Sequence, residues 1–177
     1  MDKQALAAQI YQTAHIRGSF KLRSGATSDQ YFDKYRFESN PMLLMEIAKK
    51  MADLIPDGTE VLAGLEMGGI PVATLLSQLT GLPVCFVRKE PKRYGTCKFA
   101  EGCEIEKKRL VIIEDVITSG GQAILSATDL RKAGAKVEDV ICVINREQGG
   151  PEKMATAGLR LHALFTRSEL ESASASA

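Results

Sequence analysis

The sequence contains no long apolar run, no large excess of charge and no internal repeat. None of its apolar stretches approaches the roughly 20 residues of a membrane-spanning helix, and its start, MDKQALAAQI, lacks the long apolar core of a secretory signal. A formal net charge of +1 argues against a large nucleic-acid-binding surface. These absences predict a cytoplasmic protein whose partner is a small molecule, with no nucleic acid and no membrane among its partners.

Cysteine and histidine are also scarce. The chain has four cysteines and two histidines, and no two cysteines follow the C-x-x-C spacing of many zinc and redox sites. Cys85 and Cys142 lie in strand-like apolar runs, so reduced thiols are the simplest interpretation. Cys97 and Cys103 lie in a polar segment, which leaves a disulfide or a zinc site open there. The two histidines stand near no candidate nucleophile, and we assign them no catalytic role.

The residues that are present predict one α/β domain. The length of 177 residues, 45% of them hydrophobic and 25% charged, suits a single core. Apolar, β-branched runs predict strands at Val61–Leu65, Val84–Val87, Leu110–Ile113, Val140–Ile144 and Leu161–Phe165. Helical spacing predicts helices at Lys3–Ile16, from Pro41 towards Pro56, at Ile70–Leu79, at Gln122–Lys132 and, briefly, after Pro151. Such alternation indicates βαβ units and a parallel sheet covered by helices.

Three local signals set the expected limits of these elements. Gly18 is expected to end the first helix, because glycine often follows a helix C-terminus. Asn40 and Pro41 form a helix cap followed by a proline at the first helical position. Residues 168–177 end in SASASA, and this alternation offers nothing to bury, so we expect the tail to fray.

The most informative segment reads LVIIEDVITSGG and runs from Leu110 to Gly121. Its apolar run has the character of a strand that is buried on both faces. Glu114 and Asp115 then fall at the carboxyl end of this strand, where ligands bind in open α/β sheets. The Thr-Ser-Gly-Gly turn that follows leads into a helix, and its backbone N–H groups can approach a phosphate closely. The segment therefore predicts a phosphate-binding turn.

The two carboxylates require a second explanation, because a site for phosphate alone would not place negative charge beside it. A ribose with vicinal hydroxyls would donate hydrogen bonds to them, and a magnesium ion could bridge sugar and phosphate oxygens. The alternative is an ordinary βα turn with a chance acidic pair. That alternative explains the glycines but not the whole combination.

Two further junctions suit a diphosphate. The segment RKEPKRYG, from Arg88 to Gly95, places four cations within six positions directly after a predicted strand. Such a loop could close over a diphosphate leaving group and stabilise the charge that develops on it, although a solvated surface loop is the alternative. The segment GLEMGGIP, from Gly64 to Pro71, could bind diphosphate through backbone N–H groups, or could be a purely structural turn.

Two other segments suit a flat, acidic ring. Arg146 follows a predicted strand, so its guanidinium would lie at the same edge of the sheet as the phosphate-binding turn and could bind a carboxylate or two carbonyl oxygens. An ordinary ion pair is the alternative for this arginine. Tyr31 and Phe32 are adjacent aromatics that could lie against a heterocycle, or could belong to a hydrophobic core.

Five segments, LRSG, SDQYFDKY, RKEPKRYGT, EDVITSGG and INREQGG, occur in an order that closely resembles orotate phosphoribosyltransferases, a branch of the type I phosphoribosyltransferases. The resemblance extends from about Phe20 to Arg167. It implies an α/β fold with a central, mainly parallel, twisted sheet flanked by helices. It also implies a single domain, with an N-terminal helix and small hood over about residues 1–40, a core over about 41–167 and the tail over 168–177.

The resemblance also implies the substrates and their contacts. The enzyme would transfer phosphoribosyl from 5-phospho-α-D-ribose 1-diphosphate (PRPP) to N1 of orotate in pyrimidine synthesis. PRPP would contact Arg23, Arg88, Lys89, Lys92, Glu114, Asp115, Val116, Ile117, Thr118, Ser119, Gly120, Gly121 and Gln122. Orotate would contact Tyr31, Phe32, Thr118 and Arg146, and the catalytic residues would be Lys92, Glu114 and Asp115. PRPP would carry Mg²⁺ without direct protein ligands, and a homodimer would share basic loop residues across its interface.

The chain departs from the family pattern at two places. Well-studied members carry a Tyr-Lys pair where this chain has Met67 and Gly68, and a loop histidine where it has Tyr94. The first departure removes a cation and the second removes a candidate proton donor. We hypothesise that Arg93 and the backbone N–H groups of Gly68 and its neighbouring glycine compensate. Arg93→Ala would then lose turnover while PRPP binding is kept.

Two rival interpretations stay open at the level of sequence. One is a phosphoribosyltransferase for a purine or another pyrimidine, which would require Arg146 to be irrelevant to the choice of base. The other is a regulator that senses PRPP but has lost catalysis. Such regulators usually add a nucleic-acid-binding module, and the near-neutral charge and short length leave little room for one. The cationic loop also favours catalysis.

Overall fold

The computed structural model describes residues 1–21, 25, 27–90 and 98–175. Its centre is a sheet of order β5-β4-β3-β6-β7-β8, in which only the pairing of β4 with β5 is antiparallel. The elements are α1 (Lys3–Ala14), β1 (His15–Lys21), β2 (Thr27–Phe32), α2 (Tyr35–Glu38), α3 (Pro41–Ala52), β3 (Val61–Leu65), α4 (Gly69–Thr80), β4 (Val84–Val87), β5 (Ala100–Glu101), β6 (Arg109–Ile117), α5 (Gly121–Lys132), β7 (Lys136–Asn145), α6 (Gly150–Thr156), β8 (Arg160–Thr166) and α7 (Arg167–Ala175). The mainly parallel sheet predicted from the sequence is confirmed.

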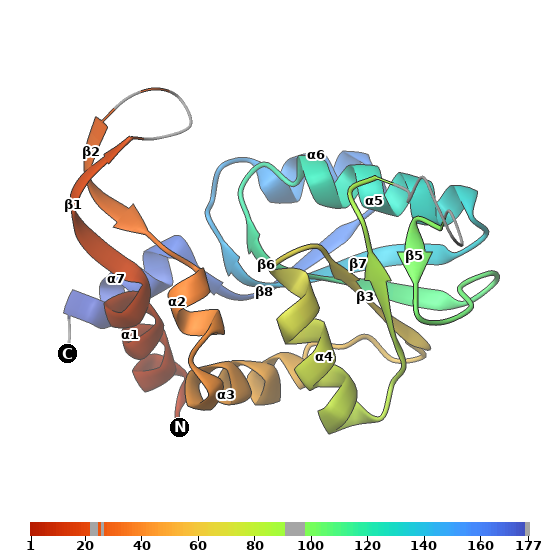
Figure 1. Cartoon of the computed structure of the whole chain (residues 1–177), viewed down its shortest axis with the longest axis horizontal. Helices are drawn as coiled ribbons and strands as arrows, with labels where there is room; N and C mark the ends of the chain where they lie inside the picture. Colours follow the sequence, from red (N-terminus) through yellow and green to blue (C-terminus); the bar gives the residue numbers. More distant parts are fainter. Residues whose placement is uncertain (22–24, 26, 91–97, 176–177) are drawn as a thin grey trace.

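Helices cover both faces of this sheet (Figure 1). The core on one face joins α1, α3, α4 and α7 to the sheet, and the core on the other face joins α5 and α6 to it. Along β6, Val111 and Ile113 belong to the first core, while Leu110 and Ile112 belong to the second. Because both faces are buried, the strand is continuously apolar rather than alternating.

Strand β6 is longer than predicted, and this changes the place of the two carboxylates. The sequence suggests a strand that stops at Ile113, with Glu114 and Asp115 following it. In the structure the parallel pairing with β7 continues to Ile117, which is opposite Asn145. The carboxylates therefore lie within the last part of the strand, and a regular backbone ladder fixes their direction.

The N-terminal helix is shorter than predicted, and Gly18 does not end it. Helix α1 stops at Ala14, and Gly18 lies within β1. The chain leaves the helix because His15 pairs with Phe32 and begins the antiparallel β1–β2 ladder. This hairpin and α2 form the hood, and the hairpin projects away from the sheet (Figure 1).

Helix α3 begins as predicted. The side chain of Asn40 accepts the backbone N–H groups of Met42 and Leu43, both at 3.1 Å, and Pro41 is the first helical residue. The helix ends at Ala52, before the proline that was expected to limit it. No helix among the described residues is long and apolar enough to cross a membrane.

The C-terminal segment does not fray as expected, because it forms α7. Leu170 and Ala173 are buried against the core, so the tail does have side chains to bury. At its start Glu169 accepts the backbone N–H of Thr166 at 2.6 Å, and the Thr166 hydroxyl accepts the N–H of Glu169 at 3.2 Å. This reciprocal cap is a capping box, which stabilises a helix N-terminus.

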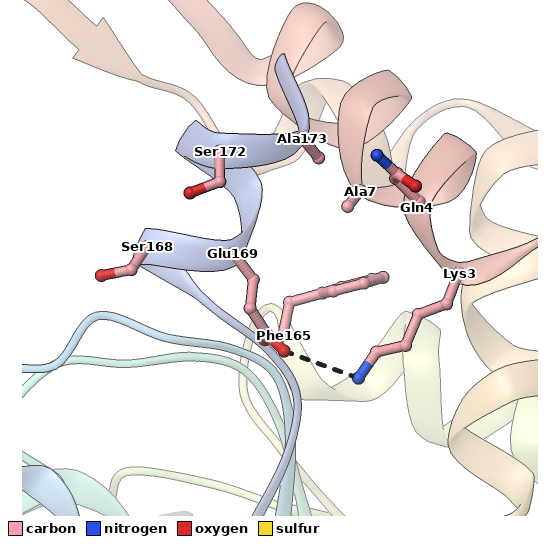
Figure 2. Close-up of a pocket in the computed structure, with 8 residues that line it drawn as sticks. All are labelled: Lys3, Gln4, Ala7, Phe165, Ser168, Glu169, Ser172 and Ala173. Carbon is pink, nitrogen blue, oxygen red and sulfur yellow. Dashed lines mark ion pairs between the residues drawn. The ribbon is translucent and has the colours of Figure 1, made fainter. Parts of the chain in front are cut away.

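Helices α1 and α7 pack together and bring the two ends of the chain side by side. Figure 2 shows the hollow of about 500 Å³ between them, with Phe165 at its base. Lys3 pairs with Glu169 across this hollow at 3.8 Å, and its ammonium lies 5.3 Å from the centre of the Phe165 ring. The C-terminal helix is thereby held by the N-terminal one.

Candidate active site

Two carboxylates lie close together near the carboxyl end of β6. Asp115 is only 1% exposed, and its Oδ1 accepts the backbone N–H of Val116 at 2.5 Å. Its Oδ2 accepts a hydrogen bond from the ammonium of Lys34, which lies just after the hood hairpin. The carboxylate of Glu114 accepts the backbone N–H of Asp115 at 3.3 Å. The predicted acidic pair is therefore preformed and largely shielded from water.

Burial also changes the acidity of this cluster. Burial, followed by the charge of Asp115, raises the pKa of Glu114 to about 8. Burial and a hydrogen bond with Asp115 likewise raise the pKa of Glu38, a residue of α2, to about 8. Burial lowers the pKa of Lys34, but the hydrogen bond and charge of Asp115 outweigh it, so the net direction is upwards. A charged lysine thus lies among carboxyl groups of which two hold their protons unusually firmly.

The turn after β6 and the start of α5 form the phosphate cradle, which we define as residues 114–122. Thr118 and Ser119 are exposed in the turn, and Gly120 has a φ of +75°. A Cβ on Gly120 would lie 2.8 Å from Cε of Met154, so both the backbone and the packing favour glycine. Helix α5 begins directly afterwards, and the N–H groups of its first turn have no intrahelical acceptor. All predicted cradle residues thus share one strand-turn-helix junction.

A second turn, residues 66–69 between β3 and α4, lies against the carboxylates. A Cβ on Gly68 would overlap the carboxylate of Asp115. A Cβ on Gly69 would overlap the backbone carbonyl oxygen of Ile113. Because only glycine permits this approach, the turn can present backbone but no side chain at residue 68.

The cationic segment begins beside this second turn. The backbone N–H of Lys89 donates to Glu66 Oε1 at 2.5 Å, which joins the end of β4 to the turn. The backbone N–H of Arg88 donates to the carbonyl oxygen of Phe99 at 3.0 Å. Nε of Arg88 is buried and has no hydrogen-bond partner among the described residues. A buried donor of this kind favours an acceptor from a ligand.

Four of the candidate substrate-binding or loop residues named in the sequence analysis lie outside the described part of the chain. They are Arg23, Lys92, Arg93 and Tyr94. The roles given to Arg23 and Lys92 as PRPP contacts therefore stay predictions. The same holds for the suggested compensation by Arg93.

A cavity of about 630 Å³ opens between the hood and the ends of β6 and β7, and we call it the base pocket. Its lining includes all four residues predicted to contact orotate, namely Tyr31, Phe32, Thr118 and Arg146. The backbone N–H of Arg146 donates to the carbonyl oxygen of Ile117 at 2.8 Å, so the end of β7 is tied to the cradle. The Phe32 ring centre lies 6.4 Å from that of Tyr11, which also borders the pocket. The base pocket and the cradle therefore meet.

The loop that carries Arg146 is tied to the C-terminal helix. Glu147 has a φ of +57°, and its backbone N–H donates to Oδ1 of Asn145 at 2.9 Å. Its carboxylate accepts both the backbone N–H and the hydroxyl of Ser168, at 2.9 and 2.6 Å. Helix α7 and the Arg146 loop are consequently one connected unit.

Several lining residues of the base pocket were not predicted from the sequence. They are Tyr11, His15, Ser28, Gln30, Lys34, Tyr35, Ile144, Arg167, Leu170 and Glu171. Most come from the hood or from α7, which are distant in sequence from the cradle. Of these segments, α7 could have been predicted from the sequence, because Thr166 and Glu169 have the spacing of a capping box.

The described cysteines are reduced, as the sequence suggests, and the two histidines make hydrogen-bonded contacts within the fold. The described free thiols are Cys85, Cys103 and Cys142, while Cys97 lies outside the described residues. A disulfide or zinc site that includes Cys97 is therefore untested. Nε2 of His15 donates to Oε1 of Gln30 at 2.8 Å in the hood, and Nε2 of His162 lies 2.8 Å from Asp139 Oδ1. His15 nevertheless borders the base pocket, which the sequence did not indicate.

Comparison with known proteins identifies the family. The phosphoribosyl transferase domain family matches residues 35–159. The orotate phosphoribosyltransferase of Nocardioides sp. is 48% identical over 168 residues, covering 95% of this chain and 94% of that protein. The orotate phosphoribosyltransferase of Methanocella arvoryzae is 41% identical over 171 residues, covering 96% and 97%.

Solved structures give the same result. The orotate phosphoribosyltransferase of Mycobacterium tuberculosis H37Rv superposes with a TM-score of 0.86 at 29% identity, covering 96% of this chain and 99% of that one. A structure of the same mycobacterial protein in complex with PRPP gives a TM-score of 0.82 at 27% identity, covering 97% and 99%. The chain therefore belongs to the orotate phosphoribosyltransferase family, within the type I phosphoribosyltransferases.

Proposed function

We propose that this protein transfers the phosphoribosyl group of PRPP to N1 of orotate, with the cradle, the second turn and the base pocket each holding one part of the substrates. The bond from C1 of the ribose to the diphosphate oxygen breaks, and a bond from C1 to N1 forms. Orotate releases its N1 proton, and the products are orotidine 5′-monophosphate and diphosphate. The observation that carries this assignment is that the base pocket shares Thr118 with the cradle and is bordered by Lys34, which pairs with Asp115.

The cradle would hold the ribose 5-phosphate part. Exposed Thr118 and Ser119 and the N-terminal N–H groups of α5 provide donors for the phosphate. Glu114 and Asp115 would accept the ribose hydroxyls. As C1 gains positive charge in an oxocarbenium-like state, these carboxyls would stabilise it, and the positive ring would favour their ionised forms.

The second turn and the end of β4 would hold the diphosphate. The buried, unpartnered Nε of Arg88 and the position of Lys89 against the turn support this assignment. Lys92 would add charge neutralisation on the leaving group. The resemblance further suggests that a homodimer supplies a loop cation across its interface, and that Arg23 contacts PRPP from the hood.

The base pocket would hold orotate between its aromatic and polar walls. Tyr31 and Phe32 would lie against the ring, and Arg146 would bind its carboxylate or carbonyl oxygens. Thr118 belongs to both the cradle and the base pocket, so it would contact both substrates. The reacting atoms would meet beside this residue, and the protein would accelerate the reaction mainly by positioning.

Magnesium would arrive with PRPP. The hard oxygen ligands that Mg²⁺ prefers are supplied by phosphate and hydroxyl oxygens of the substrate. The family resemblance implies that the ion has no direct protein ligand, and we assign none. When bound, it would neutralise charge on the diphosphate oxygens. We place the enzyme in the cytoplasm, where its charged substrates would be found.

The assignment is tested by mixing the purified protein with orotate, PRPP and Mg²⁺ and following the loss of orotate absorbance. Arg146→Ala should raise the KM for orotate by about tenfold or more, because one charge-assisted contact is lost, and should leave the KM for PRPP nearly unchanged. Lys92→Ala should mainly lower kcat. Arg109→Ala, an exposed arginine at the start of β6 and so at the opposite end of that strand from the carboxylates, serves as the arginine control for substrate affinity.

Three outcomes separate the alternatives. Turnover of orotate with an orotate-specific effect of Arg146→Ala supports the assignment. Turnover of another base but not of orotate would overturn the choice of base. PRPP binding without turnover of any base would identify a sensor in place of an enzyme.

A further inference from the structure

Lys34 joins the hood to the carboxylates, and the transfer reaction as described so far gives it no substrate contact. Its ammonium donates to Asp115, a residue 81 positions further along the chain. The side chain is 31% exposed and borders the base pocket. Its ammonium also lies 5.0 Å from the centre of the Tyr35 ring. Lys34 thus stands where the hood, the base pocket and the carboxylates meet.

The Lys34 ammonium also lies beside the second turn. A Cβ on Gly68 would be 3.0 Å from Nζ of Lys34. Residue 68 itself can supply no side chain there, because its Cβ would overlap Asp115. The positive charge at this point of the turn therefore comes from the hood.

The charge of Lys34 suits the leaving group better than the sugar. Positive charge beside the ribose would oppose the positive charge that develops at C1. On the diphosphate side the same cation would stabilise the negative charge that develops on the departing oxygen. An ammonium has three donors, and the hydrogen bond to Asp115 uses one of them.

We propose that Lys34 binds an oxygen of the leaving diphosphate while it keeps its pair with Asp115. The inference rests on the proposed transfer reaction and adds a substrate-contacting residue to it. One side chain would then fix a sugar-binding carboxylate and neutralise the departing group. Diphosphate binding would then also depend on the position of the hood.

Calorimetric titration with each half of PRPP separates this role from a purely structural one. Inorganic diphosphate with Mg²⁺, and ribose 5-phosphate in a separate titration, would be added to the wild type, Lys34→Met, Lys34→Gln and Lys34→Arg. We expect both neutral variants to weaken diphosphate binding by about tenfold or more and ribose 5-phosphate binding by clearly less, with a loss below about threefold for Lys34→Gln, which can still donate to Asp115. Lys34→Arg should recover most of the diphosphate affinity.

Lys132→Met is the matched control, because Lys132 is an exposed lysine that pairs with Asp129 at 2.9 Å at the opposite end of α5 from the cradle. It should change neither affinity. Equal weakening of both ligands by the neutral variants, or unchanged diphosphate binding, would overturn the proposal. Thermal unfolding of each variant identifies any loss of fold, and Lys34→Arg keeps the test valid if the neutral variants unfold. Failure of the wild type to turn over orotate with PRPP would instead contradict the transfer reaction itself.

Discussion

The phosphate cradle and the base pocket lie side by side but are built in opposite ways. The cradle is one continuous segment, in which a buried strand leads through a glycine turn into α5. The base pocket is formed by three separate segments, which are the hood hairpin near one end of the chain, α7 near the other end, and the Arg146 loop between them in sequence. The sheet core fixes the first directly, while the second depends on how three distant segments pack together.

This difference predicts how each region responds to substitution. Changes in the cradle act on a backbone that is held by β6 and α5, so their effects should be large and confined to PRPP. Changes at the edge of the base pocket act through contacts between separate segments, so their effects should be smaller and should fall on orotate. The following predictions test this contrast.

The largest effect is expected from Gly120→Ala in the cradle. Its φ of +75° is unfavourable for alanine by about 1–2 kcal/mol, and the new Cβ would meet Met154. The turn would have to shift, so we expect the KM for PRPP to rise by about tenfold or more. Steady-state kinetics with each substrate varied in turn would measure this.

Gly81→Ala is the matched control for that substitution. Gly81 has a φ of +74° at the end of α4, and a Cβ there would meet nothing within 4 Å. It should carry a similar backbone cost in thermal unfolding but leave both KM values unchanged. A similar rise in the KM for PRPP in both variants would show that lost stability, and not cradle geometry, is the cause.

An intermediate effect is expected from Glu147→Ala at the edge of the base pocket. The substitution removes the acceptor for both Ser168 donors, so the Arg146 loop and α7 would separate. We expect the KM for orotate to rise by about three- to fivefold with little change for PRPP. Ser168→Ala should weaken the same contact, and the double variant should be less than additive. Glu152→Ala, an exposed carboxylate of α6, is the control, and a matching effect there would refute the link.

The same contrast explains what could be predicted from the sequence. The strand-turn-helix form of the cradle was predicted correctly because its strand, carboxylates and glycines are adjacent in the chain and each has a local physical signature, while its contact with PRPP stays a prediction. Its one error was the end of β6, because the ladder with β7 carries the strand past Glu114 and Asp115. The local sequence does not show how far pairing with a distant strand will extend β6.

The base pocket could be predicted only in part. Tyr31, Phe32 and Arg146 were identified from residue type and from the family resemblance, and the structure brings them to one cavity. Helix α7 was not predicted because the Ser/Ala alternation has no apolar helical period, although Leu170 supplies a core residue. Lys34 could not be identified, since only the folded chain shows that it reaches Asp115.

The smallest effect is expected from Glu38→Gln, and it concerns the contact between the two regions. Glu38 lies on α2 of the hood, and burial together with its interaction with Asp115 raises its pKa to about 8. The folded protein therefore binds more protons than the unfolded chain between the ordinary carboxyl pKa and about pH 8. Its contribution to stability is complete at low pH and is lost as the pH rises through about 8.

The free energy of unfolding without ligands should consequently fall between about pH 5.5 and pH 9. Glu38→Gln should reduce this fall by at least about 1 kcal/mol, because one of the two raised carboxyls no longer titrates. Glu114 would still titrate, so part of the dependence should remain. Denaturant unfolding at both pH values would measure the difference, with Glu152→Gln as the exposed control. An unchanged dependence would mean that Glu38 does not hold a proton against Asp115, and that Lys34 alone couples the hood electrostatically to the cradle.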